Sequence, residues 1–256
     1  MSAASLAGFR PKRASVRSII VLAAATTRDC FDLTVTAFNL SEKYRTPVIL
    51  LTDEVVAHTR EKVVLPEPGA VEVVDRLRPT APPEWYVPYA DTASGVPPMG
   101  IFGDGYRYHV TGLFHDPMGF PTQRLDEIDP WLERINTKLE RRIEEIAMVK
   151  EDYEPGARTA LLSYGCSART ARHAMQVARA RGRKVDMLTL FTIWPFPEEQ
   201  VEALGERVER IIVPEMNLGQ LAYEVERIVG RKKVKRVVRA NGEMVTPQMV
   251  LEALEG

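Results

Sequence analysis

The residues with the greatest potential for chemistry lie in one irregular segment, residues 99–121 (MGIFGDGYRYHVTGLFHDPMGFP). It places an imidazole beside a carboxylate, His115 and Asp116, with Arg107 eight residues before the histidine. Such a pair can donate hydrogen bonds to a polar substrate, orient it and move protons. The structural alternative is an ion pair between Arg107 and Asp116 that holds the loop. The sequence leaves both interpretations open.

Other short motifs give weaker signals. GDG at 103–105 is similar to a calcium loop but lacks the further carboxylates, and the six-residue step from His109 to His115 is not a common zinc spacing. SYGCSA at 163–168 could present backbone N–H groups to an anion, although a plain β-α turn is favoured because the nucleotide-loop fingerprints are missing. Cys166 has no nearby histidine to activate it. We therefore assign no metal site and no catalytic residue.

The amino-acid composition excludes several classes of partner and of site. A formal net charge of -1 gives no electrostatic preference for nucleic acid or for an anionic membrane, and no apolar run reaches the length of a membrane span. Cys30 and Cys166 are the only cysteines, which excludes a disulfide framework and any iron–sulfur cluster held by this chain alone. A reducing cytoplasm is expected. Residues 1–17 are basic and rich in Ser and Ala, which is typical of a transit peptide or of a disordered start; we favour the disordered start.

The elements that must position the loop begin at Ser18. The apolar runs at 18–24 and 46–54 predict two buried strands, and the apolar spacing from Phe31 to Leu40 predicts a helix between them. These form one β-α-β unit, and two strands alone leave an exposed edge and apolar surface. Residues 63–126 have little periodicity and exceed the usual loop length, which indicates a functional loop.

A long helix over residues 129–152 is predicted next, with Asp129 at its N-cap and Pro130 in its first turn. From residue 157 the pattern alternates strands with helices, which predicts a mainly parallel sheet covered on both faces. The expected strands are 159–165, 184–197, 207–215 and 234–241, and the expected helices are 167–182, 198–206, 218–230 and 246–256.

Ligands of open parallel sheets collect at the carboxyl ends of the strands. Three such ends carry polar groups: Asp53 with Glu54, the stretch 165–167, and the stretch 215–217. The predicted fold class is α/β.

Several long motifs together carry a family resemblance. CFDLTVTAFNLSEKYRTPVILLTDEVVAHTRE (30–61), the loop at 99–121, TIWPFPEEQV (192–201) and VPEMNLGQLAYEVER (213–227) occur in unbroken order. From about residue 18 onward, the chain resembles the α subunit of 2-oxoacid:ferredoxin oxidoreductases, of the 2-oxoglutarate or branched-chain type.

The resemblance implies a fold and a set of partners. Residues 18–126 would be a remnant of the thiamine pyrimidine-binding domain with its active-site loop, 127–156 a connecting helix, and 157–256 a transketolase C-terminal-like domain. The family decarboxylates a 2-oxoacid on thiamine diphosphate, reduces ferredoxin through an iron–sulfur cluster and forms an acyl-CoA. A β subunit would hold most of the thiamine diphosphate site, the magnesium and the cluster, and this chain alone would bind none of them.

The chain departs from the family at its N-terminal side. It has neither a YPITP-like segment nor the glutamate that activates the thiamine aminopyrimidine, so it resembles a truncated or split α subunit. The implied partners are the β subunit, ferredoxin through the complex, and possibly a separately encoded N-terminal half. The loop would lie over the active site, with His115, Asp116 and Arg107 facing the substrate. The alternative is a non-catalytic remnant that acts as an assembly or binding module.

Overall fold

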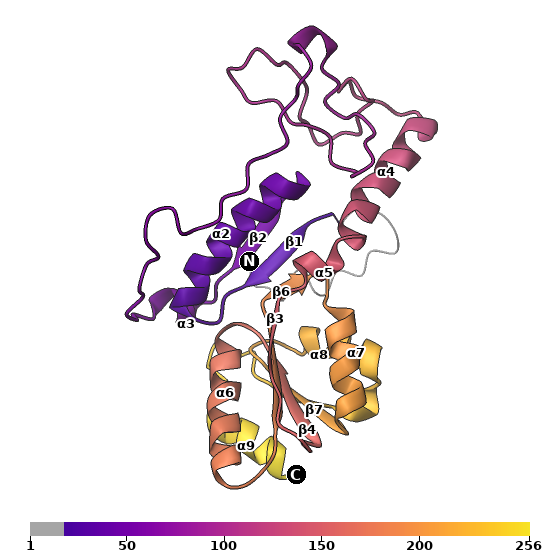
Figure 1. Cartoon of the computed structure of the whole chain (residues 1–256). Coiled ribbons are helices and arrows are strands. Elements are labelled where there is room, and N and C mark those ends of the chain that lie inside the picture. The colour runs from indigo at the N-terminus through magenta and orange to yellow at the C-terminus, as the bar shows by residue number, and fades with distance from the viewer. Residues whose placement is uncertain (1–17) are drawn as a thin grey trace.

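The computed structural model describes residues 18–256, so the expectation of a disordered start over residues 1–17 lies outside the described residues. Figure 1 shows three tiers: an irregular lobe, a small sheet covered by helix α2, and a larger sheet with helices on both faces. We call the irregular segment between α3 (Glu54–His58) and α4 (Leu125–Glu140) the loop lobe, residues 59–124; its one regular turn is the 3₁₀ helix η1 (Pro83–Trp85).

The small sheet contains the predicted β-α-β unit: β1 (Ile20–Ala23), α2 (Thr27–Tyr44) and β2 (Val48–Leu51). The side chain of Thr26 caps α2 by accepting a hydrogen bond from the Asp29 N–H. The expectation of a bare two-stranded unit was wrong, because β6 (Thr192–Trp194) pairs antiparallel with β1 on the side opposite β2. Ile20 and Leu22 of β1 are therefore fully buried.

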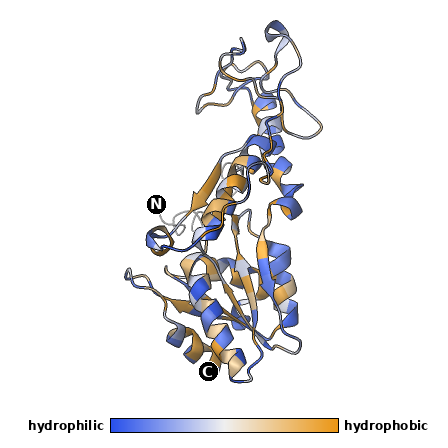
Figure 2. Cartoon of the chain, turned by 60° about the vertical axis from the view of Figure 1, so that its left-hand side comes forward, coloured by the Kyte–Doolittle hydropathy of each residue, from blue (hydrophilic) through white to orange (hydrophobic). Residues whose placement is uncertain are grey.

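The larger sheet has the strand order β3-β5-β4-β7-β8 and is parallel except for β3. Helices α6 and α9 cover one face and α7 and α8 the other (Figure 1). Figure 2 shows the apolar strands between these polar-faced helices, so the predicted α/β fold class is confirmed. The elements are β3 (Val149–Asp152), β4 (Thr159–Ser163), α6 (Gly165–Ala180), β5 (Asp186–Leu190), α7 (Glu198–Arg207), β7 (Arg210–Glu215), α8 (Gln220–Val229), η2 (Arg231–Lys233), β8 (Val234–Val238) and α9 (Pro247–Glu255).

The single helix expected over residues 129–152 was wrong at both ends. α4 begins at Leu125, which places Asp129 and Pro130 inside the helix. It ends at Glu140, a short helix α5 (Ile143–Ile146) follows, and residues 149–152 form β3. Residues 149–152 form a strand because they pair with β5, and this pairing outweighs their local helix propensity.

The single strand expected over 184–197 is two strands that belong to different sheets. β5 ends at Leu190 and β6 begins at Thr192. Phe191 lies between them, where its N–H donates to the Met148 carbonyl and its carbonyl accepts from the Ala23 N–H. This one residue thus connects the two sheets.

Two cations fasten the loop lobe to the helices below it, and a third joins α4 to the end of α2. Arg134 donates to the carbonyls of Tyr89 and Ala90, and Arg45 donates to the Pro88 carbonyl. Lys138, which is only 7% exposed, donates to the carbonyls of Tyr44 and Arg45 at the end of α2. The partners in these hydrogen bonds are backbone carbonyls at a helix C-terminus and in a loop, where a cation is favoured.

Lys138 makes the stability of the chain depend on pH. Burial, with Arg134 and Arg45 nearby, lowers the pKa of Lys138 to about 8 from its usual 10.5. The charged form therefore costs folding free energy, and that cost disappears as the pH rises from 8 toward 10.5. We expect the free energy of unfolding in urea to rise by about 2 kcal/mol between pH 7.5 and 9.5. Lys138→Met should abolish the rise, and an equal rise in the variant would assign it to another group.

Candidate functional site

Two of the predicted strand ends meet where the two sheets adjoin. The Asp53 carboxylate follows β2, and its Oδ2 accepts from the Cys166 N–H at 2.6 Å, at the start of α6. Its Oδ1 accepts from the Val56 N–H at 2.8 Å and caps α3. A Cβ at Gly165 would lie 3.0 Å from Oδ2. The helix N-terminus that could have received an anionic ligand is thus occupied by a carboxylate of the chain itself.

The third strand end, residues 215–217 at the end of β7, caps a different helix, α8. Glu215 is fully buried, and its two carboxylate oxygens accept from the N–H groups of Leu221 and Ala222 at 3.0 and 2.9 Å. Burial raises the pKa of Glu215, and these two hydrogen bonds oppose the rise. The side-chain oxygen of Asn217 accepts from the Gly219 N–H at 2.7 Å. All of these acceptors are used to start α8, so they are engaged in structure.

Cys166 is not an activated nucleophile. Its side chain is 2% exposed and its Sγ lies 3.3 Å from the Met216 Sδ. Burial, reinforced by the Asp53 carboxylate, raises the pKa of the thiol to about 12. A thiolate is needed for attack or for metal ligation, and here it is suppressed.

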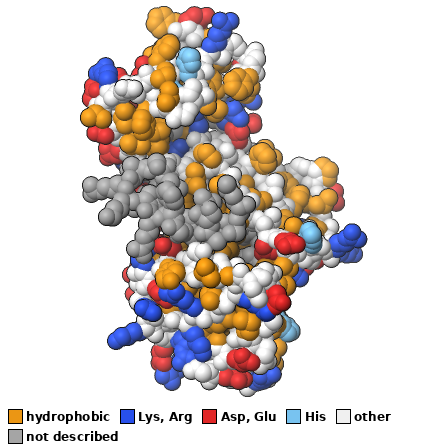
Figure 3. All heavy atoms as spheres, turned by 180° about the vertical axis from the view of Figure 1, so that it is seen from behind, with side chains coloured by type: hydrophobic (Ala, Val, Ile, Leu, Met, Phe, Trp, Pro, Cys, Tyr) orange, Lys and Arg blue, Asp and Glu red, His pale blue; other side chains and the backbone are white. Residues whose placement is uncertain are grey.

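The loop lobe is held by aromatic contacts and exposes much apolar surface. Tyr86 packs edge-on against Tyr106 and Tyr108, and its hydroxyl lies between the Pro98 carbonyl and the Gly100 N–H. Figure 3 shows hydrophobic side chains gathered over this lobe. The exposed members include Val64, Leu65, Val73, Leu77, Trp85, Phe102, Val110, Leu113, Phe114, Met118 and Phe120. A large number of exposed apolar side chains in one segment is typical of a contact surface.

The three residues predicted to face a substrate have different environments. His115 is 4% exposed, stacks on the Tyr89 ring with centroids 5.0 Å apart, and has its Nε2 2.8 Å from the Thr111 hydroxyl. Burial lowers the pKa of His115, helped by His109 and opposed by Asp116. The Asp116 Oδ1 accepts from the Phe120 N–H at 2.9 Å and closes a turn.

Arg107 is exposed, and the structure over residues 18–256 gives it no ion pair with Asp116 or with another carboxylate. The ion pair considered as the structural alternative is therefore not formed. Of the three predicted residues, Arg107 is the one whose charged group has no competing contact within the described chain.

A cavity of about 430 Å³ lies between the end of α2 and the loop lobe; Arg107, His115 and Asp116 do not line it, but Tyr89 in its lining stacks on His115. Its polar lining includes Arg45, Arg76 and Tyr89. The Arg45 guanidinium lies 5.1 Å from the centroid of the Tyr89 ring, which itself stacks on His115. Arg76 forms a two-pronged pair with Glu42. The cavity therefore presents one cation, Arg45, that has no carboxylate partner among the described residues.

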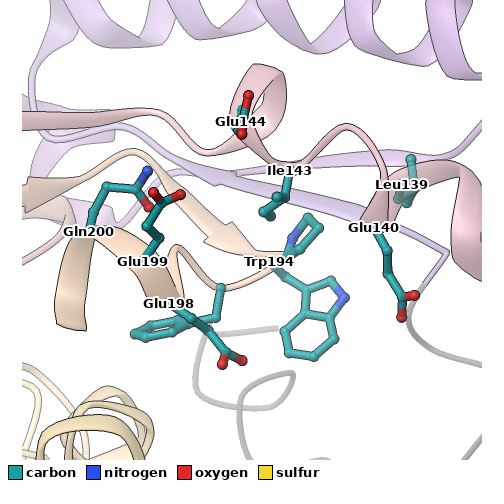
Figure 4. Close-up of a pocket in the computed structure, with 10 residues that line it drawn as sticks. Leu139, Glu140, Ile143, Glu144, Trp194, Glu198, Glu199 and Gln200 are labelled. Carbon is teal, nitrogen blue, oxygen red and sulfur yellow. The ribbon is translucent and has the colours of Figure 1, made fainter. Parts of the chain in front are cut away.

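A second cavity, of about 360 Å³, lies between α4–α5 and β6–α7 (Figure 4). Figure 4 shows an apolar floor at Trp194 and Ile143 with carboxylates around it. The glutamates in its lining are Glu140, Glu144, Glu198 and Glu199. A small anionic substrate would be repelled here, so we take the first cavity as the candidate site.

Comparison with known proteins finds two known domains in this chain. Residues 14–132 match the thiamine-diphosphate-binding domain of pyruvate flavodoxin/ferredoxin oxidoreductases, and residues 157–250 match core domain II of pyruvate:ferredoxin oxidoreductase. Two domains of the ferredoxin oxidoreductase type thus match this chain one after the other. The first match spans β1, α2, β2 and the loop lobe, and the second spans the larger sheet from β4 onward.

Individual relatives agree with these matches. The 2-oxoglutarate synthase subunit KorA of Methanothermobacter thermautotrophicus is 40% identical over 238 residues, 92% of this chain and 63% of that subunit. The ketoisovalerate oxidoreductase subunit VorB of the same organism is 31% identical over 237 residues, 92% of this chain and 59% of that subunit. The chain thus spans about three fifths of the length of these curated relatives.

A solved structure of the family shares the fold. The 2-oxoglutarate:ferredoxin oxidoreductase from Magnetococcus marinus, with 2-oxoglutarate, coenzyme A and succinyl-CoA bound, superposes with a TM-score of 0.83 at 26% identity. The match covers 93% of this chain and 42% of that one. No helix within residues 18–256 has the length and apolarity to cross a membrane.

The described residues do not by themselves fit a metal ion or an iron–sulfur cluster. Within residues 18–256, no three His, Cys, Asp or Glu side chains gather into a group that could hold a metal ion. The thiol of Cys166 is protonated and buried, so it is a poor cluster ligand. Of the carboxylates in the two cavities, Glu42 and Glu198 are paired with Arg76 and Arg227. We therefore derive no reaction step through thiamine, magnesium or a cluster held by this chain alone.

Proposed function

We propose that the chain is the α subunit, or a split part of the α subunit, of a thiamine-dependent 2-oxoacid:ferredoxin oxidoreductase. Its complex would convert 2-oxoglutarate or a related 2-oxoacid to the acyl-CoA and reduce ferredoxin. The observation that carries the proposal is the occurrence of both family domains, in order, in a chain 40% identical to a 2-oxoglutarate synthase subunit. Thiamine diphosphate supplies the decarboxylation chemistry when it is bound, and the β subunit would hold magnesium and the cluster.

Within this proposal the chain contributes a substrate-facing loop and a domain for assembly. Residues 18–126 would belong to the pyrimidine-binding domain, and residues 157–256 would form the second domain. Residues 127–156 would connect the two. The exposed apolar surface of the loop lobe supports contact with a β subunit. Two free cysteines suit the reducing cytoplasm, the compartment we propose.

We assign Arg107, His115 and Asp116 to the substrate side of the loop lobe. The exposed Arg107 guanidinium can bind a 2-oxoacid carboxylate in a two-pronged fashion without breaking an existing ion pair. His115 is neutral near pH 7 because burial lowers its pKa, and its stacking on Tyr89 holds the turn that carries Asp116. His115 is therefore a positioning residue, and Arg107 is the direct contact.

Reconstitution tests the proposed function. The chain would be combined with a β subunit of the family, with and without a polypeptide that supplies the α-subunit segment that this chain does not span, and assayed for viologen reduction with 2-oxoglutarate and coenzyme A. Turnover is expected only in the complete mixture. Stable assembly without turnover by any 2-oxoacid would favour the alternative, a non-catalytic assembly module.

Two substitutions test the site in the active complex. Arg107→Ala should raise the KM for the 2-oxoacid by about 10- to 100-fold, the range for losing a hydrogen-bonded charge, with an unchanged melting temperature. Asp116→Asn keeps the Oδ1 acceptor of the turn and should lower kcat by about 10²-fold if the charge acts on the substrate. Arg78→Ala, another exposed arginine of the loop lobe, is the matched control. Normal kinetics with a lowered melting temperature would assign both residues to structure.

A further inference from the structure

The cavity between the end of α2 and the loop lobe contains a guanidinium group that is only partly used. Arg45 lies at the C-terminal end of α2, which Figure 1 shows below the loop lobe. Its Nη1 donates to the Pro88 carbonyl at 2.5 Å and to the carbonyls of Pro97 and Pro98 at 3.4 and 3.3 Å. No hydrogen bond within residues 18–256 uses its Nε or its Nη2. These two nitrogens form the side-on fork with which an arginine binds a carboxylate.

The backbone of Arg45 is in an unfavourable conformation. Its φ of 44° and ψ of 57° are left-handed, and within the described chain it is the only residue other than glycine with a positive φ. Glycine is usual at the end of a helix in this conformation, because a Cβ costs free energy there. The guanidinium is held against the Tyr89 ring, 5.1 Å from its centroid. A strained arginine with a fixed orientation indicates that its side chain has a use.

Three cations lie close together at this place without an ion pair. The hydrogen bonds of Arg45, Arg134 and Lys138 within residues 18–256 all go to backbone carbonyls. Burial lowers the pKa of Arg134 and of Lys138, and so does the charge of Arg45, while Asp91 opposes the shift at Arg134. An anion beside Arg45 would therefore relieve repulsion among the three positive charges.

Most of the remaining cavity lining is apolar or already paired. The second guanidinium of the lining, that of Arg76, is engaged with Glu42 through hydrogen bonds of 2.7 and 2.6 Å. A ligand with one carboxylate and an apolar body matches such a lining, whereas a second carboxylate would meet apolar walls. The volume of about 430 Å³ is in the range of small-molecule pockets. The apolar lining residues are Pro47, Leu77, Val96, Pro97, Met99 and Val110.

We propose that this cavity is a binding site for a small organic monocarboxylate with an apolar body, held by the Nε–Nη2 fork of Arg45. The body would lie against Leu77, Met99 and Val110, so the ligand would bridge α2 and the loop lobe. The three residues proposed to contact the 2-oxoacid do not line this cavity, so the site is separate from theirs. The inference therefore goes beyond the proposed function and does not depend on it.

Titration of the purified chain with three matched probes tests the class of ligand. Hexanoate has both the carboxylate and the apolar body, acetate has only the carboxylate, and hexylamine carries a cation in place of the carboxylate. Hexanoate should bind at least about tenfold more tightly than either, because only hexanoate gains from both the buried methylene groups and the fork. Equal binding of acetate would mean an adventitious ion only, and equal binding of hexylamine would mean apolar contact only. Either result, or no binding of hexanoate, overturns the proposal.

Substitutions at Arg45 test the fork. Arg45→Lys keeps the charge, and Arg45→Gln keeps a hydrogen-bond donor without the charge. Hexanoate should bind at least about tenfold more weakly to the glutamine variant, with the lysine variant in between. Arg107→Ala should leave the affinity for hexanoate within about twofold, as expected for a charge outside the site. Unchanged affinity in Arg45→Gln, or a tenfold loss in Arg107→Ala, would place the carboxylate elsewhere and overturn the proposal.

An exposed wall residue gives a second test, because Arg45 also fastens the loop lobe and its variants need not fold. Val110 lines the cavity and is 64% exposed. Val110→Glu should weaken hexanoate binding at least about tenfold by repulsion, and Val110→Lys should not weaken it. Val73→Glu is the matched control, since Val73 is an exposed valine of the loop lobe outside the lining. Equal weakening by the two glutamate variants overturns the proposal. The reconstitution assay judges the proposed function separately, because hexanoate has no 2-oxo group.

Discussion

Replacing Glu215 by alanine is expected to lower the free energy of unfolding by about 3 kcal/mol or more. The carboxylate is fully buried and accepts from the N–H groups of Leu221 and Ala222. Alanine leaves both donors without a partner in the core, and each such buried group costs about 1–3 kcal/mol. The truncated side chain also leaves a void. Urea unfolding followed by circular dichroism measures the change.

Two further variants separate the contributions at Glu215. Glu215→Gln keeps one carbonyl oxygen as an acceptor but points an amide N–H toward a backbone N–H. It should therefore lose a large part of the unfolding free energy that Glu215→Ala loses. Glu199→Ala, at an exposed glutamate of the acidic cavity, should leave the stability within about 0.5 kcal/mol. A loss below 1 kcal/mol in Glu215→Ala would mean that water replaces the carboxylate and that the cap is dispensable.

Replacing Asp53 by alanine is expected to cost about 2–3 kcal/mol and to loosen the contact between the two sheets. One oxygen of this carboxylate caps α3 and the other accepts from the Cys166 N–H at the start of α6. A cap is worth about 1 kcal/mol, and a charge-assisted hydrogen bond at a helix N-terminus adds a similar or larger amount. The buried thiol of Cys166 should then react faster with a thiol reagent.

Asparagine at position 53 distinguishes the two oxygens. Asp53→Asn can still cap α3 through Oδ1, but its amide cannot accept from the Cys166 N–H at the Oδ2 position. We expect about half of the stability loss together with most of the gain in thiol reactivity. A slow thiol reaction in both variants would show that Asp53 stabilises α3 and does not hold the sheets together.

The sequence was sufficient for elements whose signal is local. The run IVLA of β1, the existence of helix α2 and the strand-helix alternation from β4 to α9 follow from the hydrophobic period. β3 and β6 were missed because each is short and is defined by a partner far along the chain. The start of α4 was misplaced because Pro130 is tolerated inside the helix.

The candidate site was predictable in part. The carboxyl ends of strands were recognised as places for polar groups, and Asp53 and Cys166 do meet there. The cavity cation Arg45 was missed, because no local pattern marks it: it ends α2 in a left-handed conformation and finds its partners, Tyr89 and Pro88, in the loop lobe. Contacts of this kind depend on how the lobe folds back, which one sequence does not encode locally.

The pairing of β1 with β6 also fixes an order of events during synthesis. β1 leaves the ribosome long before β6, since Val21 pairs with Trp194, which emerges only after the loop lobe, α4 and half of the larger sheet. Closing the β1–β6 pair brings together parts of the chain that are distant in sequence, a slow step. The last strand of the small sheet is translated directly after β5 of the larger one. The β2-β1-β6 sheet is therefore completed no earlier than the larger sheet is half built.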